Sequence, residues 1–238
     1  MNVAQKTVLI TGANRGLGRA LVDEALKRGA RRVYAGTRGP WQHADRRVTS
    51  LTLDVTSAAD IQRAATRVDA VDLLINNAGI SLPDDLSDPA MIEQHLAVNL
   101  LGPFNVTQAF SPLVKRAKGA IVNVLSLAAI APVPIWPAYG ISKAAMSSLT
   151  QSLRMFLARD GVSVHAAFLG PVDTDMIRDF DLPKTPPEAV AAGIFDGLER
   201  GEEDIFPDPM SQSVADAWRN SINKELERQF AGYMPPAH

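Results

Sequence analysis

The 238-residue sequence contains no cysteine. That absence excludes disulfide frameworks, thiolate zinc sites, iron–sulfur clusters and every mechanism that uses a cysteine nucleophile. Long apolar runs are missing too, and none approaches the roughly 18 residues that a membrane-spanning helix needs. The N-terminus lacks the charged start and apolar core of a signal peptide. We therefore expect a soluble cytoplasmic protein that does not bind membranes.

Charge of one sign is not in excess either. The sequence has 24 lysines and arginines against 26 aspartates and glutamates, which gives a formal net charge of −2. A dedicated nucleic-acid or anionic-membrane surface would need a strongly basic balance, so we expect neither partner. The four histidines show no metal-ligand spacing, and Asp173 and Asp175 have no further ligands nearby in the sequence. No metal site is expected.

Short apolar runs alternate with helical patterns along the chain. The runs predicted as strands are Thr7–Thr11, Arg32–Gly36, Val48–Leu53, Val71–Asn76, Ala120–Leu125, Val162–Phe168 and Asp204–Pro207. The predicted helices are Gly18–Arg28, Ala58–Val68, Pro89–Lys115 with breaks at Gly102–Pro103 and Ser111–Pro112, Tyr139–Asp160, Pro187–Arg200 and Ala217–Phe230. This alternation is typical of βαβ units around a buried parallel sheet. We predict one Rossmann-like α/β domain over residues 1–238, a doubly wound parallel sheet in three αβα layers.

A glycine-rich turn follows the first predicted strand. It reads TGANRGLG over Thr11–Gly18 and leads directly into a helical pattern. Gly12 permits a tight exit from the strand, Gly16 lets the backbone approach a pyrophosphate, and Gly18 lets the helix pack closely on the sheet. An ordinary strand-to-helix turn is the simpler interpretation, but the position in a βαβ unit favours a dinucleotide site. No Lys-Ser/Thr pair follows, which disfavours ATP or GTP.

The second predicted strand ends without an acidic residue. An NAD site usually places Asp or Glu at this point to bind the ribose diol. Arg38 is available here instead, with Arg15 inside the glycine turn. Two guanidinium groups favour a ribose 2′-phosphate, whereas the alternative interpretation is that both arginines are only solvated. We predict NADP(H) as the preferred cofactor and NAD(H) as the second choice.

A tyrosine and a lysine lie at the start of the longest helical pattern. The spacing 143 − 139 = 4 puts Tyr139 and Lys143 on one face of a helix. An ordinary tyrosine has a pKa near 10, and a nearby ammonium group lowers that pKa. Ser126 follows a predicted strand, where ligands bind in open α/β sheets. Each feature alone is unspecific, because a tyrosine and lysine at this spacing on a helix are usually a surface pair, but their joint occurrence with the glycine turn favours a functional site.

At these residues the sequence resembles the short-chain dehydrogenase/reductase family, in its compact single-domain branch. The resemblance covers the chain from Thr7 to about Pro207. The matching motifs, in order, are TGANRGLG at 11–18, LDVT at 53–56, NNAG at 76–79, VNLLGPF at 98–104, the strand before Ser126, YGISK at 139–143 and GPVDTDM at 170–176. One motif departs from the pattern: the family often has Pro-Gly where this chain has Gly170-Pro171, and we expect the turn to survive.

The resemblance implies a role for each matching residue. Tyr139 would be the acid/base, Ser126 would hydrogen-bond the substrate oxygen, Lys143 would lower the pKa of Tyr139, and Asn99 would hold a water of the proton relay. The residues implied in cofactor binding are Gly12, Asn14, Arg15, Gly16, Leu17, Gly18, Thr37, Arg38, Asp54, Val55, Asn77, Ala78, Gly79, Tyr139, Lys143, Gly170, Pro171, Val172 and Thr174. Asp54 is equally consistent with a helix cap or a turn residue, and NNAG with a purely architectural role.

The residues predicted at the substrate site are mostly apolar. They are Ser126, Leu127, Ala128, Trp136, Tyr139 and Met176, with Ile135 and a short substrate loop at about 176–187. No carboxylate clamp is apparent, so we predict a small, apolar aldehyde, ketone or secondary alcohol. Arg178 and Lys184 leave an acidic substrate open.

Other functions on the same fold are weaker alternatives. An NADP(H)-binding regulatory or sensor protein with little turnover usually lacks the tyrosine or the lysine. An extended-branch epimerase needs a larger C-terminal domain, and an enoyl reductase has a different Tyr–Lys spacing. The resemblance also implies a homodimer or homotetramer formed through the helices that carry Asn99 and Tyr139.

Overall fold

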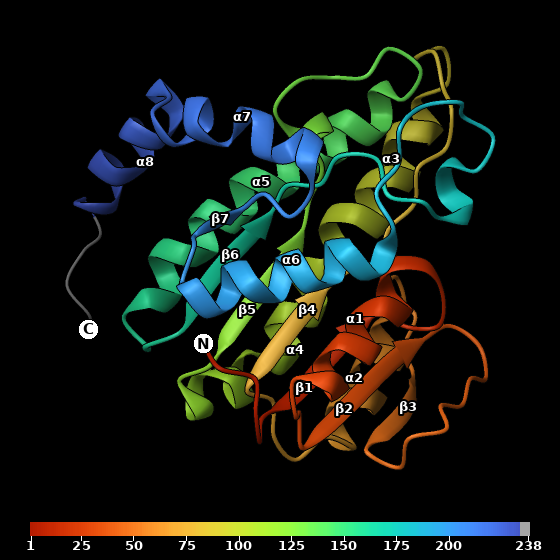
Figure 1. The fold of residues 1–238 in the computed structure, drawn as a ribbon, viewed down its shortest axis with the longest axis vertical. Coiled ribbons are helices and arrows are strands. Elements are labelled where there is room, and N and C mark those ends of the chain that lie inside the picture. Colours follow the sequence, from red (N-terminus) through yellow and green to blue (C-terminus); the bar gives the residue numbers. More distant parts are fainter. Residues whose placement is uncertain (234–238) are drawn as a thin grey trace.

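The computed structural model describes residues 1–233; residues 234–238, including His238, lie outside the described part. Seven parallel strands form one sheet in the order β3-β2-β1-β4-β5-β6-β7 (Figure 1). The strands are β1 (Thr7–Thr11), β2 (Arg32–Thr37), β3 (Val48–Thr52), β4 (Leu73–Asn76), β5 (Ala120–Val124), β6 (Ser163–Ala167) and β7 (Asp204–Ile205). The predicted α/β fold, a doubly wound parallel sheet in a single domain, is confirmed.

Helices cover both faces of the sheet, as the buried apolar strands require. They are α1 (Gly16–Lys27), α2 (Ala58–Thr66), α3 (Pro89–Leu96), α4 (Gly102–Ala117), α5 (Pro137–Ala158), α6 (Pro187–Arg200), α7 (Pro209–Arg219) and α8 (Ile222–Ala231). Val8 and Ile10 of β1 pack with α1 and α6 on one face, whereas Leu9 packs with α2, α4 and α5 on the other. This alternation follows from the two-residue period of a strand. In Figure 1, α7 and α8 extend beyond the edge of the sheet.

Of the two predicted breaks in the 89–115 helix, the one at Gly102–Pro103 lies where α4 begins, whereas the one at Ser111–Pro112 is absent. A π-helical turn, Ala97–Leu101, joins α3 to α4, and Pro112 lies inside α4. Proline has no N–H for the carbonyl four residues before it, which here belongs to Gln108. Ser111 Oγ donates a hydrogen bond to that carbonyl oxygen at 3.2 Å. The side chain therefore satisfies the group that the proline leaves unpaired.

The C-terminal helix also differs from its prediction. Instead of one helix over 217–230, α7 ends at Arg219 and α8 begins at Ile222. Ser221 is the N-cap of α8, because its side chain accepts a hydrogen bond from the N–H of Lys224. The sequence reading did not recognise this cap.

The strand order reverses between β1 and β4. The chain runs outward from β1 to β3 in one direction and from β4 to β7 in the other. Ligands of doubly wound folds bind at such a switch point, outside the carboxyl ends of the strands. Within residues 1–233, no helix is long and apolar enough to cross a membrane, and no group of three or more His, Asp or Glu side chains could hold a metal ion.

Candidate active site

A cleft of about 610 Å³ opens at the carboxyl ends of the central strands. Every predicted site residue except Thr37, Asn99 and Ile135 lines it. Lining residues that sequence reasoning did not single out are Leu53, Thr56, Ile80, Ser81, Val98, Val124, Leu125, Val133, Leu169, Asp173, Asp175 and Met210. The predicted residues are thus brought together in one place, although they come from segments far apart in the chain.

The glycine turn is held tightly against β4. Gly12 has φ +66°, and a Cβ on Gly18 would lie 1.9 Å from the carbonyl oxygen of Gly12. Only glycine fits either position. The first turn of α1 contains no acidic residue, and its N-cap, Arg15, makes no side-chain cap hydrogen bond. The N–H groups at this helix end therefore suit an external anion.

The NNAG segment braces the same turn. Thr11 Oγ1 accepts hydrogen bonds from the N–H groups of Asn77 and Ala78, both at 3.0 Å. Asn77 Nδ2 donates to the carbonyl oxygens of Thr11 and Gly12 at 2.9 and 3.2 Å. Asn77 and Ala78 also line the cleft. The motif is therefore architectural, and the same residues face the space that a cofactor would fill.

The end of the cleft beside β2 and β3 carries the exposed Arg38. Asp54 Oδ1 accepts hydrogen bonds from the N–H and Oγ1 of Thr56, and these bonds, with Arg38 nearby, hold the pKa of Asp54 below its ordinary value. Asp54 is a turn residue, since Ser57 caps α2. Arg38 forms no ion pair with any described residue. Arg15, in contrast, pairs with Asp175 through Nη1 and Oδ2 at 3.4 Å.

Thr37 lies at this end but outside the cleft. Its side chain is buried, and Oγ1 donates to the carbonyl oxygen of Gly39 at 2.7 Å. The hydroxyl of Thr37 is thus turned into the loop, and contact between Thr37 and the cofactor stays a prediction.

Ser126, Tyr139 and Lys143 meet at the centre of the cleft. Ser126 ends the segment after β5, and the first turns of α5 place Tyr139 and Lys143 on one face, with Lys143 Nζ 5.7 Å from the centre of the Tyr139 ring. Burial raises the pKa of Tyr139 above its ordinary value, and a hydrogen bond with Ser126 offsets part of this rise. The resemblance implied that Lys143 would lower the pKa of Tyr139, whereas here burial dominates and Ser126 does the lowering.

Lys143 is itself perturbed. It is only 6% exposed, and its Nζ donates to the carbonyl oxygen of Val124 at 2.8 Å. No carboxylate of the described residues pairs with it, and burial lowers the pKa of Lys143 to about 8. At neutral pH the lysine thus keeps its proton, with little margin.

Asn99 lies behind Tyr139 and Lys143, in the π-helical turn. Its Oδ1 accepts from the N–H of Ile80, and its Nδ2 donates to the carbonyl oxygen of Ile80 and to Ser142 Oγ, all at 2.9 Å. Ser142 Oγ in turn donates to the carbonyl oxygen of Tyr139 at 2.7 Å. Asn99 is buried and is linked to the backbone of Tyr139 through one side chain, that of Ser142.

The other end of the cleft is apolar. A bridge between Val172 and Thr185 closes a loop that carries Met176, Ile177 and Leu182 into the lining. The rings of Trp136 and Phe180 meet edge to face at 4.5 Å. Ile135, expected in the wall, does not line the cleft and is 46% exposed.

The Gly170–Pro171 turn keeps its place through the C-terminal tail. The N–H of Gly170 donates to Asp208 Oδ2 at 2.8 Å, and Asp208 also caps α7 through the N–H of Ser211. A Cβ on Gly170 would lie 2.6 Å from Asp208 Oδ1. The reversed Gly-Pro order is thus accommodated by a buried carboxylate, which also brings Met210 to the cleft.

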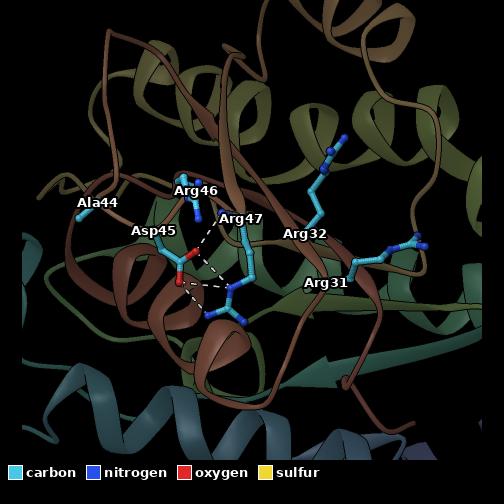
Figure 2. A pocket seen from close by; sticks show the side chains of 6 residues that line it. All are labelled: Arg31, Arg32, Ala44, Asp45, Arg46 and Arg47. Carbon is cyan, nitrogen blue, oxygen red and sulfur yellow. Dashed lines mark hydrogen bonds and ion pairs between the residues drawn. The ribbon is translucent and has the colours of Figure 1, made fainter.

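A second, open hollow lies where β2 and β3 begin, at the opposite end of these strands from Arg38. Figure 2 shows the four arginines that line it, with Asp45 bonded to Arg47. The side chains of Arg31 and Arg32 point away from Arg47 (Figure 2). These guanidinium groups do not converge on one point, so the hollow is not a built anion site.

Known proteins match this chain over most of its length. A family model described as short chain dehydrogenase matches residues 6–184. Estradiol 17-beta-dehydrogenase 2 of Mus musculus is 33% identical over 197 residues, 76% of this chain and 51% of the mouse protein. An uncharacterized oxidoreductase of Staphylococcus epidermidis is 32% identical over 192 residues, 75% of this chain and 83% of the relative. The chain spans about half the length of the rodent relatives it matches.

Solved structures extend the likeness to the whole chain. A short chain dehydrogenase from Burkholderia cenocepacia J2315, crystallised in complex with NADP, has a TM-score of 0.88 at 33% identity, covering 99% of this chain and 100% of that one. A short-chain dehydrogenase from Streptomyces avermitilis has a TM-score of 0.81 at 23% identity, covering 94% of this chain and 96% of that one, a likeness of fold.

Proposed function

The chain belongs to the short chain dehydrogenase family, and we propose that it is an NADP(H)-dependent oxidoreductase that interconverts a small apolar aldehyde or ketone and its alcohol. The observation that carries this proposal is the meeting of Ser126, Tyr139 and Lys143 in one cleft with the glycine turn. Family membership supports an oxidoreductase activity; the cofactor preference, the substrate class and the roles of the residues belong to the proposal with it.

The cleft fits a nicotinamide dinucleotide. The uncapped N-terminus of α1 and the close approach of Gly12 and Gly18 suit a pyrophosphate. Arg38 forms no ion pair within residues 1–233 and suits a 2′-phosphate, and Arg15 lines the same cleft. The Burkholderia relative was solved with NADP, which supports the same choice here. When bound, the cofactor supplies the hydride chemistry, and the protein supplies orientation and proton transfer.

Tyr139 is the proposed proton donor and acceptor. In the reduction direction its hydroxyl hydrogen moves to the substrate oxygen, which Ser126 Oγ holds by a hydrogen bond. The positive charge of Lys143 stabilises the phenolate that remains. Asn99, through Ser142, keeps the first turn of α5 in place and is the proposed site of a water that returns the proton.

The proposed substrate is neutral and apolar. Val133, Trp136, Met176, Leu182 and Met210 line its end of the cleft, and Ser126 and Ser81 are among the few polar side chains there. We assign the loop between Val172 and Thr185 to substrate binding, a slightly different span from the expected 176–187. The two ends of this loop are bonded, since Thr185 N–H donates to the carbonyl oxygen of Pro171 at 2.9 Å.

The decisive experiment is a panel of carbonyl compounds assayed for oxidation of NADPH and NADH. We expect NADPH to give the higher kcat/KM and Arg38→Asp to reverse or abolish that preference. Tyr139→Phe should reduce kcat by about 10²–10⁴-fold while cofactor binding, measured by fluorescence titration, persists. Retained turnover in Tyr139→Phe would overturn the assignment. Tight NADPH binding without turnover of any carbonyl or alcohol would favour a sensor protein.

We also propose that the protein is a homodimer or homotetramer. The outer face from the π-helical turn to α5 exposes Leu101, Phe104, Ile141 and Phe156, and exposed apolar patches mark interaction sites. The charge-introducing variant Phe156→Glu should reduce the mass measured by sedimentation, whereas Gln62→Glu, which introduces a charge at an exposed polar residue of α2, is the matched control. An unchanged mass in Phe156→Glu would place the interface elsewhere.

A further inference from the structure

His95 is the one histidine beside the catalytic tyrosine, among the described residues. It is fully buried on α3. Its Nδ1 lies 2.7 Å from the carbonyl oxygen of Met91, and its Nε2 lies 3.1 Å from the backbone nitrogen of Leu82. A carbonyl only accepts and an N–H only donates, so Nδ1 carries the proton and Nε2 is the acceptor. The imidazole is thus held as one neutral tautomer.

His95 and Asn99 hold the same short segment of backbone. His95 accepts a hydrogen bond from the N–H of Leu82, and Asn99 accepts one from the N–H of Ile80 and donates one to the carbonyl oxygen of Ile80. Four residues of a helix rise about 6 Å, and two residues of an extended chain span about 6.6 Å. The distance between His95 and Asn99 along the helix therefore matches the distance between Leu82 and Ile80 along the extended segment. Ser81, between the two bonded residues, lines the cleft with Gly79.

Both side chains also reach Tyr139. The His95 ring meets the Tyr139 ring edge to face, with 6.5 Å between centres and an interplanar angle of 70°. Asn99 reaches the carbonyl oxygen of Tyr139 through Ser142 Oγ. One residue thus contacts the reactive ring and the other holds its backbone, while both fix the segment that faces it across the cleft.

We propose that His95 is a positioning residue for the reaction, and that His95 and Asn99 form a clasp that sets segment 79–82 and Tyr139 relative to each other. The inference rests on the proposed function, because it assigns Tyr139 as the acid/base. His95 itself does not touch the reacting atoms: its two nitrogens are occupied by backbone groups. Its part is to keep Leu82 N–H paired and the tyrosine ring oriented.

Two amide substitutions separate the two nitrogens. In His95→Gln, the longer side chain places an acceptor near the position of Nε2 and can keep the bond from Leu82 N–H. In His95→Asn, the shorter side chain keeps only the group near Nδ1. Misplacement of catalytic groups by about 1 Å costs up to about 10²-fold in rate. We expect His95→Asn to lower kcat by about 10- to 100-fold with a small change in KM for NADPH, and His95→Gln to restore most of kcat.

Amide hydrogen exchange provides a readout that does not need turnover. In the wild-type protein the Leu82 amide should be protected, and His95→Asn should lose that protection while amides of β1 and β5 keep theirs. Equal kcat and equal Leu82 protection in His95→Asn and His95→Gln would overturn the clasp. If the wild-type protein turns over no carbonyl but the exchange pattern changes as expected, the proposed function fails and the clasp stands.

Discussion

Two lysines of this protein are buried to nearly the same extent in opposite electrostatic surroundings. Lys143, in the cleft, is 6% exposed and Lys224, on α8, is 3% exposed. Lys143 donates to one carbonyl oxygen and has no carboxylate beside it. Lys224 lies 2.9 Å from Asp204 and 2.6 Å from Glu227. Burial is therefore not what distinguishes a functional from a structural cation; the partners are.

The pKa values follow the partners. Burial lowers the pKa of Lys143 to about 8. Burial alone would also lower the pKa of Lys224, but Asp204 and Glu227 raise it above its ordinary value. Burial likewise works against ionisation of Asp204, yet Arg154 and Lys224 hold the pKa of Asp204 below its ordinary value. The C-terminal cluster is thus neutralised internally, while the cleft keeps an uncompensated charge that a negative group on Tyr139 would stabilise.

The largest expected effect is on catalysis. Lys143→Met should reduce kcat by about 10²–10⁴-fold because the phenolate of Tyr139 loses its stabilising charge. The free energy of unfolding of the same variant should be higher than that of the wild-type protein by about 1–2 kcal/mol at pH 7. The lowered pKa means that burial of the charged Lys143 destabilises the wild-type protein by about 3 kcal/mol, a cost that the variant avoids. The carbonyl oxygen of Val124 is left unpaired in the variant, which destabilises it by about 1–2 kcal/mol. Steady-state kinetics and urea unfolding measure the two; a less stable Lys143→Met would contradict this account.

Lys224→Met should have the opposite effects: a loss of stability and almost no change in kcat. Removal of this cation leaves Asp204 and Glu227 with Arg154 alone, and breaking a buried pair typically costs about 3–5 kcal/mol. We expect a loss of about 3 kcal/mol in unfolding free energy with kcat nearly unchanged. Arg228→Met, an exposed cation on the same helix, is the matched control and should change stability little. Equal losses in both variants would show that the cluster contributes no more than a surface pair.

The pH dependence of stability should separate the same two lysines. The pKa of Lys143 is about 8 in the folded chain and 10.5 unfolded, so between these values the unfolded state binds more protons and stability rises with pH. From pH 8 to pH 10.5 the stability difference between Lys143→Met and wild type should therefore move by about 3 kcal/mol in favour of wild type, which reverses the advantage of about 1–2 kcal/mol that the variant has at pH 7. Lys224 has a raised pKa, so its contribution is full below 10.5 and is lost only above it. The gap between wild type and Lys224→Met should stay constant over this window.

Sequence patterns predicted a role for Lys143 but not for Lys224, and the reason is the separation of their partners along the sequence. Tyr139 and Lys143 lie four residues apart, and the glycine turn is contiguous, so a local pattern is enough to indicate both. Lys224 gains Asp204 from β7 in addition to Glu227 of its own helix, and Asp208 meets Gly170 across 38 residues. Only the folded chain brings these together. His95 is an intermediate case. The sequence contains its four-residue spacing to Asn99, but no local pattern predicts the extended segment to which both side chains bond.

The exposed ion pair between Arg15 and Asp175 should contribute least to stability among these charged groups. Both side chains are at least half exposed, and pairs of this kind contribute about 0–1 kcal/mol. Asp175→Asn should therefore leave the unfolding free energy nearly unchanged. It should still lower the KM for NADPH about two- to fivefold at low salt, because Arg15 no longer shares its charge between a carboxylate and the cofactor phosphates, and 0.5 M salt should erase the difference. If Asp175→Asn improves NADH and NADPH equally, Arg15 serves the pyrophosphate; if it improves NADPH alone, Arg15 belongs with Arg38 at the 2′-phosphate.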